Sequence, residues 1–127
     1  MSARRCAVEL LSEVLDRKRP FDEAVARHAP LQALSERDRN FTRLMVMTVL
    51  RRFGQIDALL ATMLEKPLQG KSNEVMHALR LGVVQLVWLQ TPAHAAVHAM
   101  VETVSELGHD RMKELVNVVL KRVAKEG

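Results

Sequence analysis

Arginine is the residue type whose number and placement most clearly suggest chemistry in this sequence. The first 53 residues hold ten arginines and one lysine against seven carboxylates, whereas residues 54–127 hold eight basic and eight acidic residues. The first part therefore carries the whole net charge of +4. A guanidinium group is a planar fork that binds phosphate through two parallel hydrogen bonds. This distribution predicts a nucleic-acid partner contacted mainly by the N-terminal half, although solubility alone also accounts for a charge of this size.

Two of these arginines, Arg4 and Arg5, fall at the expected start of the first helix. Cations are unfavourable at that position because the first backbone N–H groups and the helix dipole already attract anions. A bound anionic ligand would resolve the conflict. We therefore predict that both side chains contact phosphate.

Another group of arginines lies in the first turns of a later predicted helix. Arg37, Arg39 and Arg43 belong to this group, and Arg39 and Arg43 are one helical turn apart. We add all three to the predicted phosphate contacts. Arg51 and Arg52 close the same helix, where cations suit the dipole and require no ligand.

The sharpest candidate for a metal site is His94, His98 and Glu102, which are spaced four residues apart on one predicted helix. The helical zinc-protease motif needs a glutamate directly after the first histidine, and Ala95 stands there instead. Residues i and i+8 also lie about 12 Å apart along a helix axis, so the three side chains cannot easily converge. We predict no metal site and no cofactor.

Other catalytic chemistry lacks the residues that it would need. Cys6, the single cysteine, lies in an apolar stripe and has no recognisable general base, and no glycine-rich phosphate loop is present. The chain is therefore predicted to be non-catalytic. One cysteine excludes an internal disulfide, and the longest apolar stretch, 81–89, is too short for a membrane span. With no secretory signal pattern, we expect a cytoplasmic protein without a membrane partner.

The elements that must position these side chains all show helical periodicity. Ser2 and Ser35 are predicted N-caps, Gly54 and Gly108 predicted helix ends, and Asp110 the predicted cap of the last helix. Residues 69–73 form the clearest predicted loop, in which Ser72 or Asn73 caps the next helix. The expected helices cover about 3–17, 22–28, 36–53, 56–64, 73–89, 93–107 and 111–123. The second is predicted to stop before Pro30 and the fourth at Lys66-Pro67, because the residue before a proline avoids helical geometry.

Two of these helices, 36–53 and 73–89, are apolar around most of their circumference and are predicted to be central. In the first of them this apolar set is Phe41, Leu44, Met45, Val46, Met47, Val49 and Leu50. We predict an all-α fold: a compact bundle of about seven helices in two subassemblies, forming a single domain over residues 1–127. Aromatic residues make up only 3% of the chain, which weakens any model in which bases stack on an aromatic platform.

Four segments, taken in order, resemble NusB-type domains over essentially the whole chain. The resemblance implies a NusB-like fold and RNA binding, with the arginine-rich N-terminus of NusB matching Arg4 and Arg5. Asn117 and Lys121, in the last segment, join the RNA-binding residues that it implies. The four segments are Ser35-Glu36-Arg37-Asp38-Arg39 through Asp57, Leu79-Arg80-Leu81-Gly82-Val83-Val84-Gln85-Leu86, Pro92-Ala93-His94-Ala95-Ala96-Val97 and Leu115-Val116-Asn117-Val118-Val119-Leu120-Lys121-Arg122.

The family has two main branches, and their functions differ. One is the antitermination factor NusB, which binds boxA RNA with a ribosomal protein. The other is the N-terminal domain of the 16S rRNA (cytosine-5) methyltransferase RsmB (Sun/Fmu). The segment 19–24 and the two segments that begin at Ser35 and Pro92 are more similar to the methyltransferase branch. This resemblance implies a non-catalytic domain that positions rRNA for a separate SAM-dependent catalytic domain.

Two alternatives remain open from the sequence. A free-standing antitermination factor would prefer one short single-stranded RNA and a ribosomal protein. A helical protein-interaction module would use exposed apolar anchors, for which Trp88 and Met63 are the candidates.

Overall fold

The structure, a computed structural model, describes residues 1–66, 68 and 73–126, and every regular element in these ranges is helical. Of the predicted loop at 69–73, only Asn73 is described, and it is the first residue of α6; the Ser72 cap and the stop at Pro67 lie outside the described residues. The N-terminal elements are α1 (Ala3–Leu11) with the π-helical turn η1 (Ser12–Asp16), α2 (Phe21–Arg27), α3 (Ala29–Gln32), α4 (Glu36–Arg51) and α5 (Phe53–Met63). The C-terminal elements are α6 (Asn73–Val83) with the π-helical turn η3 (Val84–Trp88), α7 (Ala93–Glu106), the 3₁₀ turn η4 (Asp110–Met112) and α8 (Lys113–Glu126).

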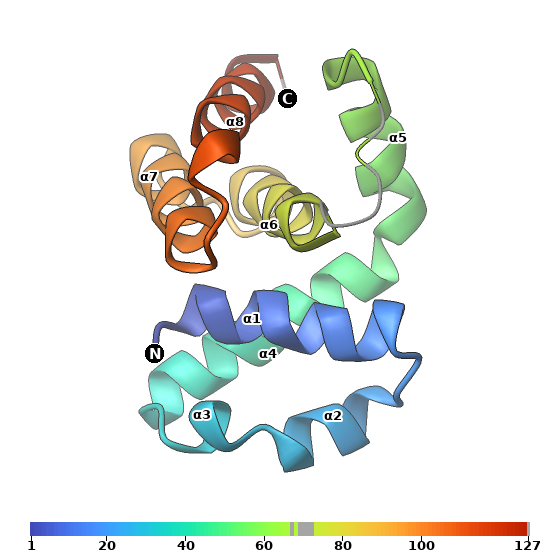
Figure 1. Cartoon of the computed structure of the whole chain (residues 1–127), viewed down its shortest axis with the longest axis vertical. Coiled ribbons are helices and arrows are strands. Elements are labelled where there is room, and N and C mark those ends of the chain that lie inside the picture. Colours follow the sequence, from blue (N-terminus) through green and yellow to red (C-terminus); the bar gives the residue numbers. More distant parts are fainter. Residues whose placement is uncertain (67, 69–72, 127) are drawn as a thin grey trace.

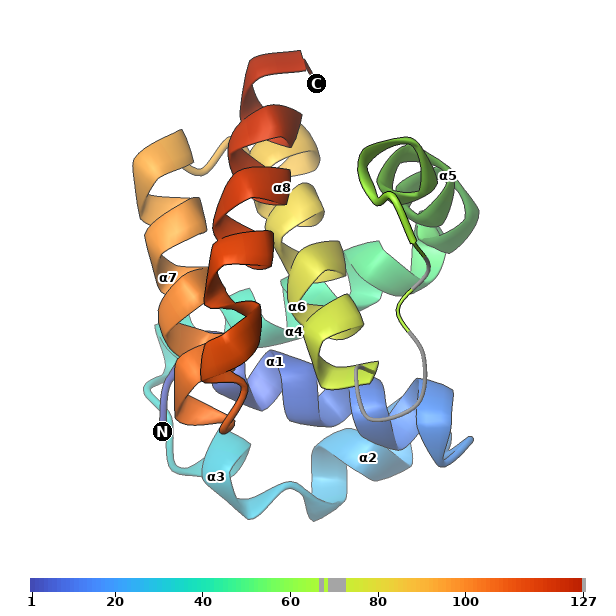
Figure 2. The ribbon, with the colours of Figure 1, turned by 45° about the horizontal axis from the view of Figure 1, so that its top comes forward.

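The helices form the two predicted subassemblies, and α1 lies between them. In Figure 1, α2 and α3 lie on one side of α1 and the group α6, α7 and α8 on the other, with α4 packed across α1. Figure 2 shows α6, α7 and α8 side by side, with α5 beside α6. The all-α fold and the division into two subassemblies are confirmed.

Side chains cap the helices where the sequence predicts. The Ser2 Oγ accepts a hydrogen bond from the Arg5 backbone N–H at 3.1 Å, and the Ser35 Oγ accepts one from Asp38 at 3.2 Å. These bonds satisfy backbone donors that the first turn of a helix leaves free. Gly108, with φ +89°, ends α7 in a left-handed conformation that a glycine adopts without strain.

The prediction that α4 is buried on all sides is wrong. Its buried face consists of Thr42, Met45, Val46 and Val49, whereas the side of the helix that carries Leu44 faces solvent. The many apolar residues of α4 do not all find partners, because only one side of the helix packs against α1 and α6. The corresponding prediction for α6 is confirmed, since residues on most of its circumference are buried.

Three predicted boundaries also differ from the structure. The sequence reading treats Pro30 as a helix stop, but Pro30 lies in the first turn of α3, where its missing N–H is not needed. Gly54 does not end α4; it is the second residue of α5, which follows directly after Arg52. Asp110 begins the 3₁₀ turn η4 and does not cap α8 directly.

The close approach of α6 to α8 depends on Gly82. A Cβ atom at this position would lie 2.5 Å from the Cδ1 of Leu120, whose side chain is fully buried. None of the helices in the described part of the chain combines the length and apolarity that crossing a membrane requires.

Candidate nucleic-acid interface

Arg4 is held by contacts within the protein. Its Nε donates a hydrogen bond to the Oε1 of Gln85 at 2.9 Å, and its guanidinium lies 5.3 Å from the centre of the Phe41 ring. Gln85 is fully buried and is fixed in turn by a bond from its Nε2 to the Leu81 carbonyl. Burial lowers the pKa of the Arg4 guanidinium, and the nearby Asp38 partly offsets this effect. Arg4 thus ties α1 to α4 and η3.

Arg5 lies between two carboxylates of the chain itself. Its Nε is 3.6 Å from the Oε2 of Glu9, and its Nη1 is 3.9 Å from the Oε2 of Glu106. Neither distance is short enough for a good hydrogen bond, and among the described residues the buried Nε has no hydrogen-bond partner. Glu9 and Glu106 therefore supply part of the negative charge that offsets the unfavourable position of Arg5 at a helix start.

Arg39 also has partners within the protein. Its Nη1 donates to the carbonyl of Leu34 at 3.0 Å and to that of Gln32 at 3.4 Å. These carbonyls lie at and just after the end of α3, so Arg39 satisfies acceptors that the short helix leaves free.

The solvent-facing side of α4 presents a row of exposed side chains that we call the α4 outer stripe: Arg37, Asn40, Leu44 and Arg51. Their spacing of three, four and seven residues places them along one face of the helix, over about 21 Å. Arg43, also exposed, flanks the stripe. In the part of the chain that the structure describes, neither Arg37 nor Arg43 has an ion pair or a side-chain hydrogen bond. Both guanidinium groups are thus available to an external anion.

One end of the stripe opens into a groove of about 660 Å³, which we call the α4 groove. Arg4 and the α4 residues Arg37, Asn40, Phe41 and Leu44 line one side. The turn 89–92, between η3 and α7, lines the other side. The structure thus brings together Arg4 and Arg37, two predicted contacts that lie 33 positions apart in the sequence.

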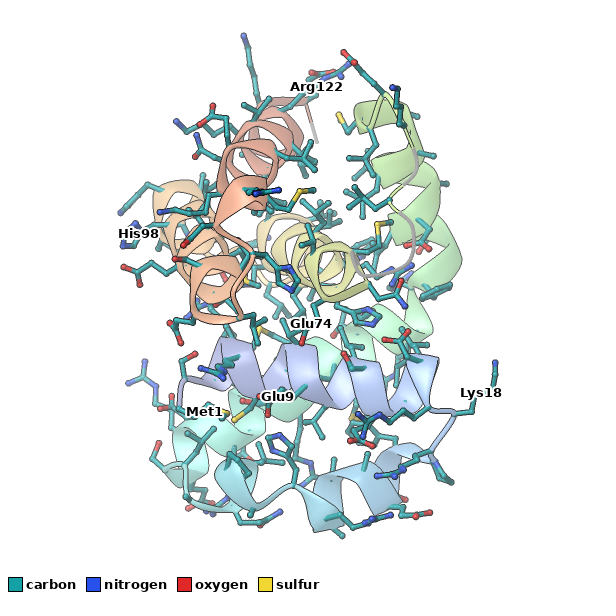
Figure 3. The ribbon with its side chains drawn as sticks, viewed as in Figure 1. Met1, Glu9, Lys18, Glu74, His98 and Arg122 are labelled. Carbon is teal, nitrogen blue, oxygen red and sulfur yellow. The ribbon has the colours of Figure 1, made fainter. Side chains whose placement is uncertain are left out.

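The predicted residues Asn117 and Lys121 lie elsewhere, in a groove of about 390 Å³ between α7 and α8. His94 and His98 share this groove, and apolar residues such as Val97 line it. Figure 3 shows His98 projecting outward from α7, where its Nε2 lies 3.0 Å from the Oε1 of Glu102. No cluster of three potential metal ligands occurs among the described residues.

Sequence reasoning missed a buried polar network around His77. The His77 Nε2 lies 3.0 Å from the Oδ2 of Asp16, and Nη1 of Arg80 lies 3.0 Å from His77 Nδ1. Arg80 also donates two hydrogen bonds to Asp57, at 2.8 and 2.9 Å. Burial lowers the pKa of His77, against the opposing effect of Asp16. A histidine and an arginine one turn apart in the apolar α6 were the available signal, because buried polar groups need partners.

The apolar anchors expected from the sequence are not exposed. Trp88 and Met63 are both half-buried, and the guanidinium of Arg52 lies 5.5 Å from the Trp88 ring. The exposed large apolar residues include Leu44, at 48%, and Val118, at 52%. Of these two, only Leu44 lines the α4 groove. Cys6 is fully buried, and burial raises the pKa of its thiol.

Comparisons with known proteins find one family model and a set of relatives. The model of the NusB family matches residues 1–125. The ribosomal RNA small subunit methyltransferase B of Xanthomonas campestris pv. campestris is 37% identical over the whole chain, and that of Pseudomonas putida is 32% identical. The chain spans about 29% of the length of each of these relatives.

A solved structure shares the fold. The crystal structure of the antitermination factors NusB and NusE in complex with dsRNA matches with a TM-score of 0.81 and 23% identity. The match covers 98% of this chain and 95% of the solved chain.

Proposed function

Because the chain belongs to the NusB family, we propose that it is a non-catalytic RNA-binding domain. In this proposal it positions rRNA for a separate SAM-dependent domain that methylates a cytosine. The two methyltransferases described above are more than three times as long as this chain, which leaves ample length for such a domain in them. The RNA is rRNA in the cytoplasm, and the catalytic chemistry lies outside residues 1–127.

The observation that carries the proposal is the exposed side of α4, which bears the α4 outer stripe and Arg43 beside it. Arg37 and Arg43 are exposed and unpaired within the described residues, on a helix face with no packing partner there. Cations left unpaired at a surface suit a phosphate backbone, which binds through charge and the release of counterions. The resulting affinity is steeply salt-dependent and only weakly dependent on sequence.

The remaining predicted residues have secondary roles in this proposal. Lys121, exposed on α8, adds a phosphate contact, and Asn117 offers an amide in the α7–α8 groove. Arg4, Arg5 and Arg39 contribute through the guanidinium N–H groups that their protein partners leave free, so we expect smaller effects from them.

The experiment that tests the proposal measures binding of the chain to a fluorescein-labelled single-stranded RNA of mixed sequence over a salt series. Replacing Arg37 and Arg43 together by Ala should reduce the slope of log K against log salt by about 1.4, two contacts' worth. Affinity at low salt should fall at least ten-fold. The thermal midpoint should not change, because neither side chain has a partner among the described residues.

The matched control is the pair Arg111→Ala and Lys125→Ala, which removes the same charge at exposed positions away from α4. If this control lowers the slope as much as the α4 pair does, the stripe is not the interface. If the chain binds boxA-like RNA far better than a scrambled RNA, it acts as an antitermination factor. If it binds no RNA at low salt, it is a protein-interaction module.

A further inference from the structure

The α4 groove holds more than a phosphate contact requires. Phosphate needs only cations and N–H donors, but this groove also exposes apolar surface from Leu44 and Phe41. It also carries two side-chain amides, Asn40 and Gln90, which both donate and accept hydrogen bonds. Within the described residues neither amide has a side-chain hydrogen bond.

These features of the groove together complement the surface of an unpaired nucleobase. A base has an apolar face and an edge with both donors and acceptors, and it is attached to a phosphate. Resting on the proposed RNA-binding function, we propose that the α4 groove takes one unstacked base of a single-stranded RNA. Leu44 and Phe41 contact its face, Asn40 and Gln90 face its edge, and Arg37 contacts the neighbouring phosphate.

The groove is built to keep its shape before RNA arrives. The Phe41 ring is held by the Arg4 guanidinium, which Gln85 fixes from the buried interior. On the other side of the groove, Gln90 adopts φ +53°, the left-handed conformation in which the chain leaves the end of η3, so its place is set by the helix end. Arg4 is thus a positioning residue for the groove.

Charge and chemistry favour RNA over another protein chain as the occupant. Two arginines and one aspartate line the groove, so an anionic ligand is favoured. An apolar protein side chain would fill the Leu44 surface but would leave the two amides without partners, and leaving a polar group buried and unpaired is unfavourable. The groove volume of about 660 Å³ lies in the range typical of small-ligand sites. One base is an occupant of that kind.

The test compares Leu44→Ala and Asn40→Ala with Val118→Ala, which truncates an equally exposed apolar residue on α8 away from both grooves. Binding is measured for the mixed-sequence single-stranded RNA, for the same sequence as a blunt duplex, and for inorganic polyphosphate, which has no bases. Leu44→Ala should weaken single-stranded RNA binding about five- to ten-fold. The salt slope should not change, because the lost contact is not ionic.

Binding of polyphosphate and of duplex should be the same for the parent chain and for Leu44→Ala. If Leu44→Ala behaves like Val118→Ala on all three probes, the base site is disproved, although the Arg37 and Arg43 result still stands. Equal losses on polyphosphate and RNA would also disprove it. If Leu44→Ala instead weakens dimerisation in sedimentation and leaves RNA binding unchanged, the groove takes a second copy of this chain and the proposal is wrong. If the parent chain binds no RNA, the proposed function and this inference both fail.

Discussion

Two helix beginnings in this molecule are rich in arginine, and they differ in what holds those side chains. At the start of α1, Arg4 donates to the buried Gln85, and Arg5 lies near Glu9 and Glu106. In the first turns of α4, Arg37 and Arg43 face solvent and have no ion pair within the described residues. Arginines at the start of α1 thus contact groups of the protein itself, whereas those in the first turns of α4 are available to contact a ligand.

The difference comes from where each helix lies. α1 is packed between the two subassemblies, so its side chains meet α4, α6 and α7, and charges there must find partners within the fold. α4 lies at the surface with one face open, and arginines on that face gain nothing from the protein's own groups. Availability for a ligand therefore follows from the tertiary position of a helix, and local helix electrostatics do not decide it.

Replacing Arg4 by Ala should produce the largest difference in stability between the starts of α1 and α4. The change removes a charged hydrogen bond and leaves the buried Oε1 of Gln85 without a donor, so the free energy of unfolding should fall by about 2 kcal/mol. Urea titration followed by circular dichroism measures this loss. Arg37→Ala serves as the control and should leave stability within about 0.5 kcal/mol. Equal stability of the two variants would contradict the contrast drawn above.

Arg39 tests the contrast within α4 itself. Because Arg39 caps carbonyls at the end of α3, Arg39→Ala should lower the free energy of unfolding by about 1 kcal/mol. Arg43→Ala, one turn further along the same helix, should change RNA binding and leave stability unaltered. The comparison would fail if Arg43→Ala proved the more destabilising of the two in the same urea titration.

A smaller effect, on the pH dependence of the free energy of unfolding, should distinguish the buried His77 from the exposed His98. Burial lowers the pKa of His77 below its ordinary value of 6.5, with Asp16 and Glu74 opposing this effect and Arg80 adding to it. As pH falls through 6.5 the unfolded chain binds a proton that the folded chain does not, so the free energy of unfolding decreases until the lowered folded pKa is passed. Urea titrations between pH 8 and pH 5 measure this slope.

One variant tests the assignment of the pH effect to His77, and a second variant is its control. His77→Gln should remove this part of the slope, whereas His98→Gln, at an exposed position, should retain it. The assignment to His77 would be wrong if His98→Gln flattened the slope and His77→Gln did not.

Much of the fold could be predicted from the sequence because periodicity and caps are local signals. The Ser2 and Ser35 caps were confirmed because each depends only on residues within one turn. The apolar pattern of α6 was confirmed as a buried helix because α1, α5, α7 and α8 all pack against it. The exposure of Leu44 could not be predicted, since the pattern of α4 shows how much apolar surface exists but not how much of it has a neighbour. The short helix α3 was missed because Pro30 was read as a stop, although a proline is allowed in a first helical turn.

The candidate interface was harder to predict because it depends on contacts between residues that are far apart in the sequence. Composition indicated an arginine-rich half, but only three-dimensional contacts distinguish Arg37 from Arg4, since Gln85 lies 81 positions away from Arg4 in the sequence. Likewise, the contribution of Gln90 to the α4 groove depends on a turn that brings 89–92 opposite α4.

The place of α1 in the middle of the fold has a consequence for synthesis on the ribosome. Its apolar residues are buried partly against α6, which begins at Asn73, so they cannot be fully covered until most of this domain has been made. At about 5–20 residues per second the first helix would wait several seconds with its apolar face uncovered. Nascent chains halted before α6 has emerged should therefore be the ones that chaperones bind.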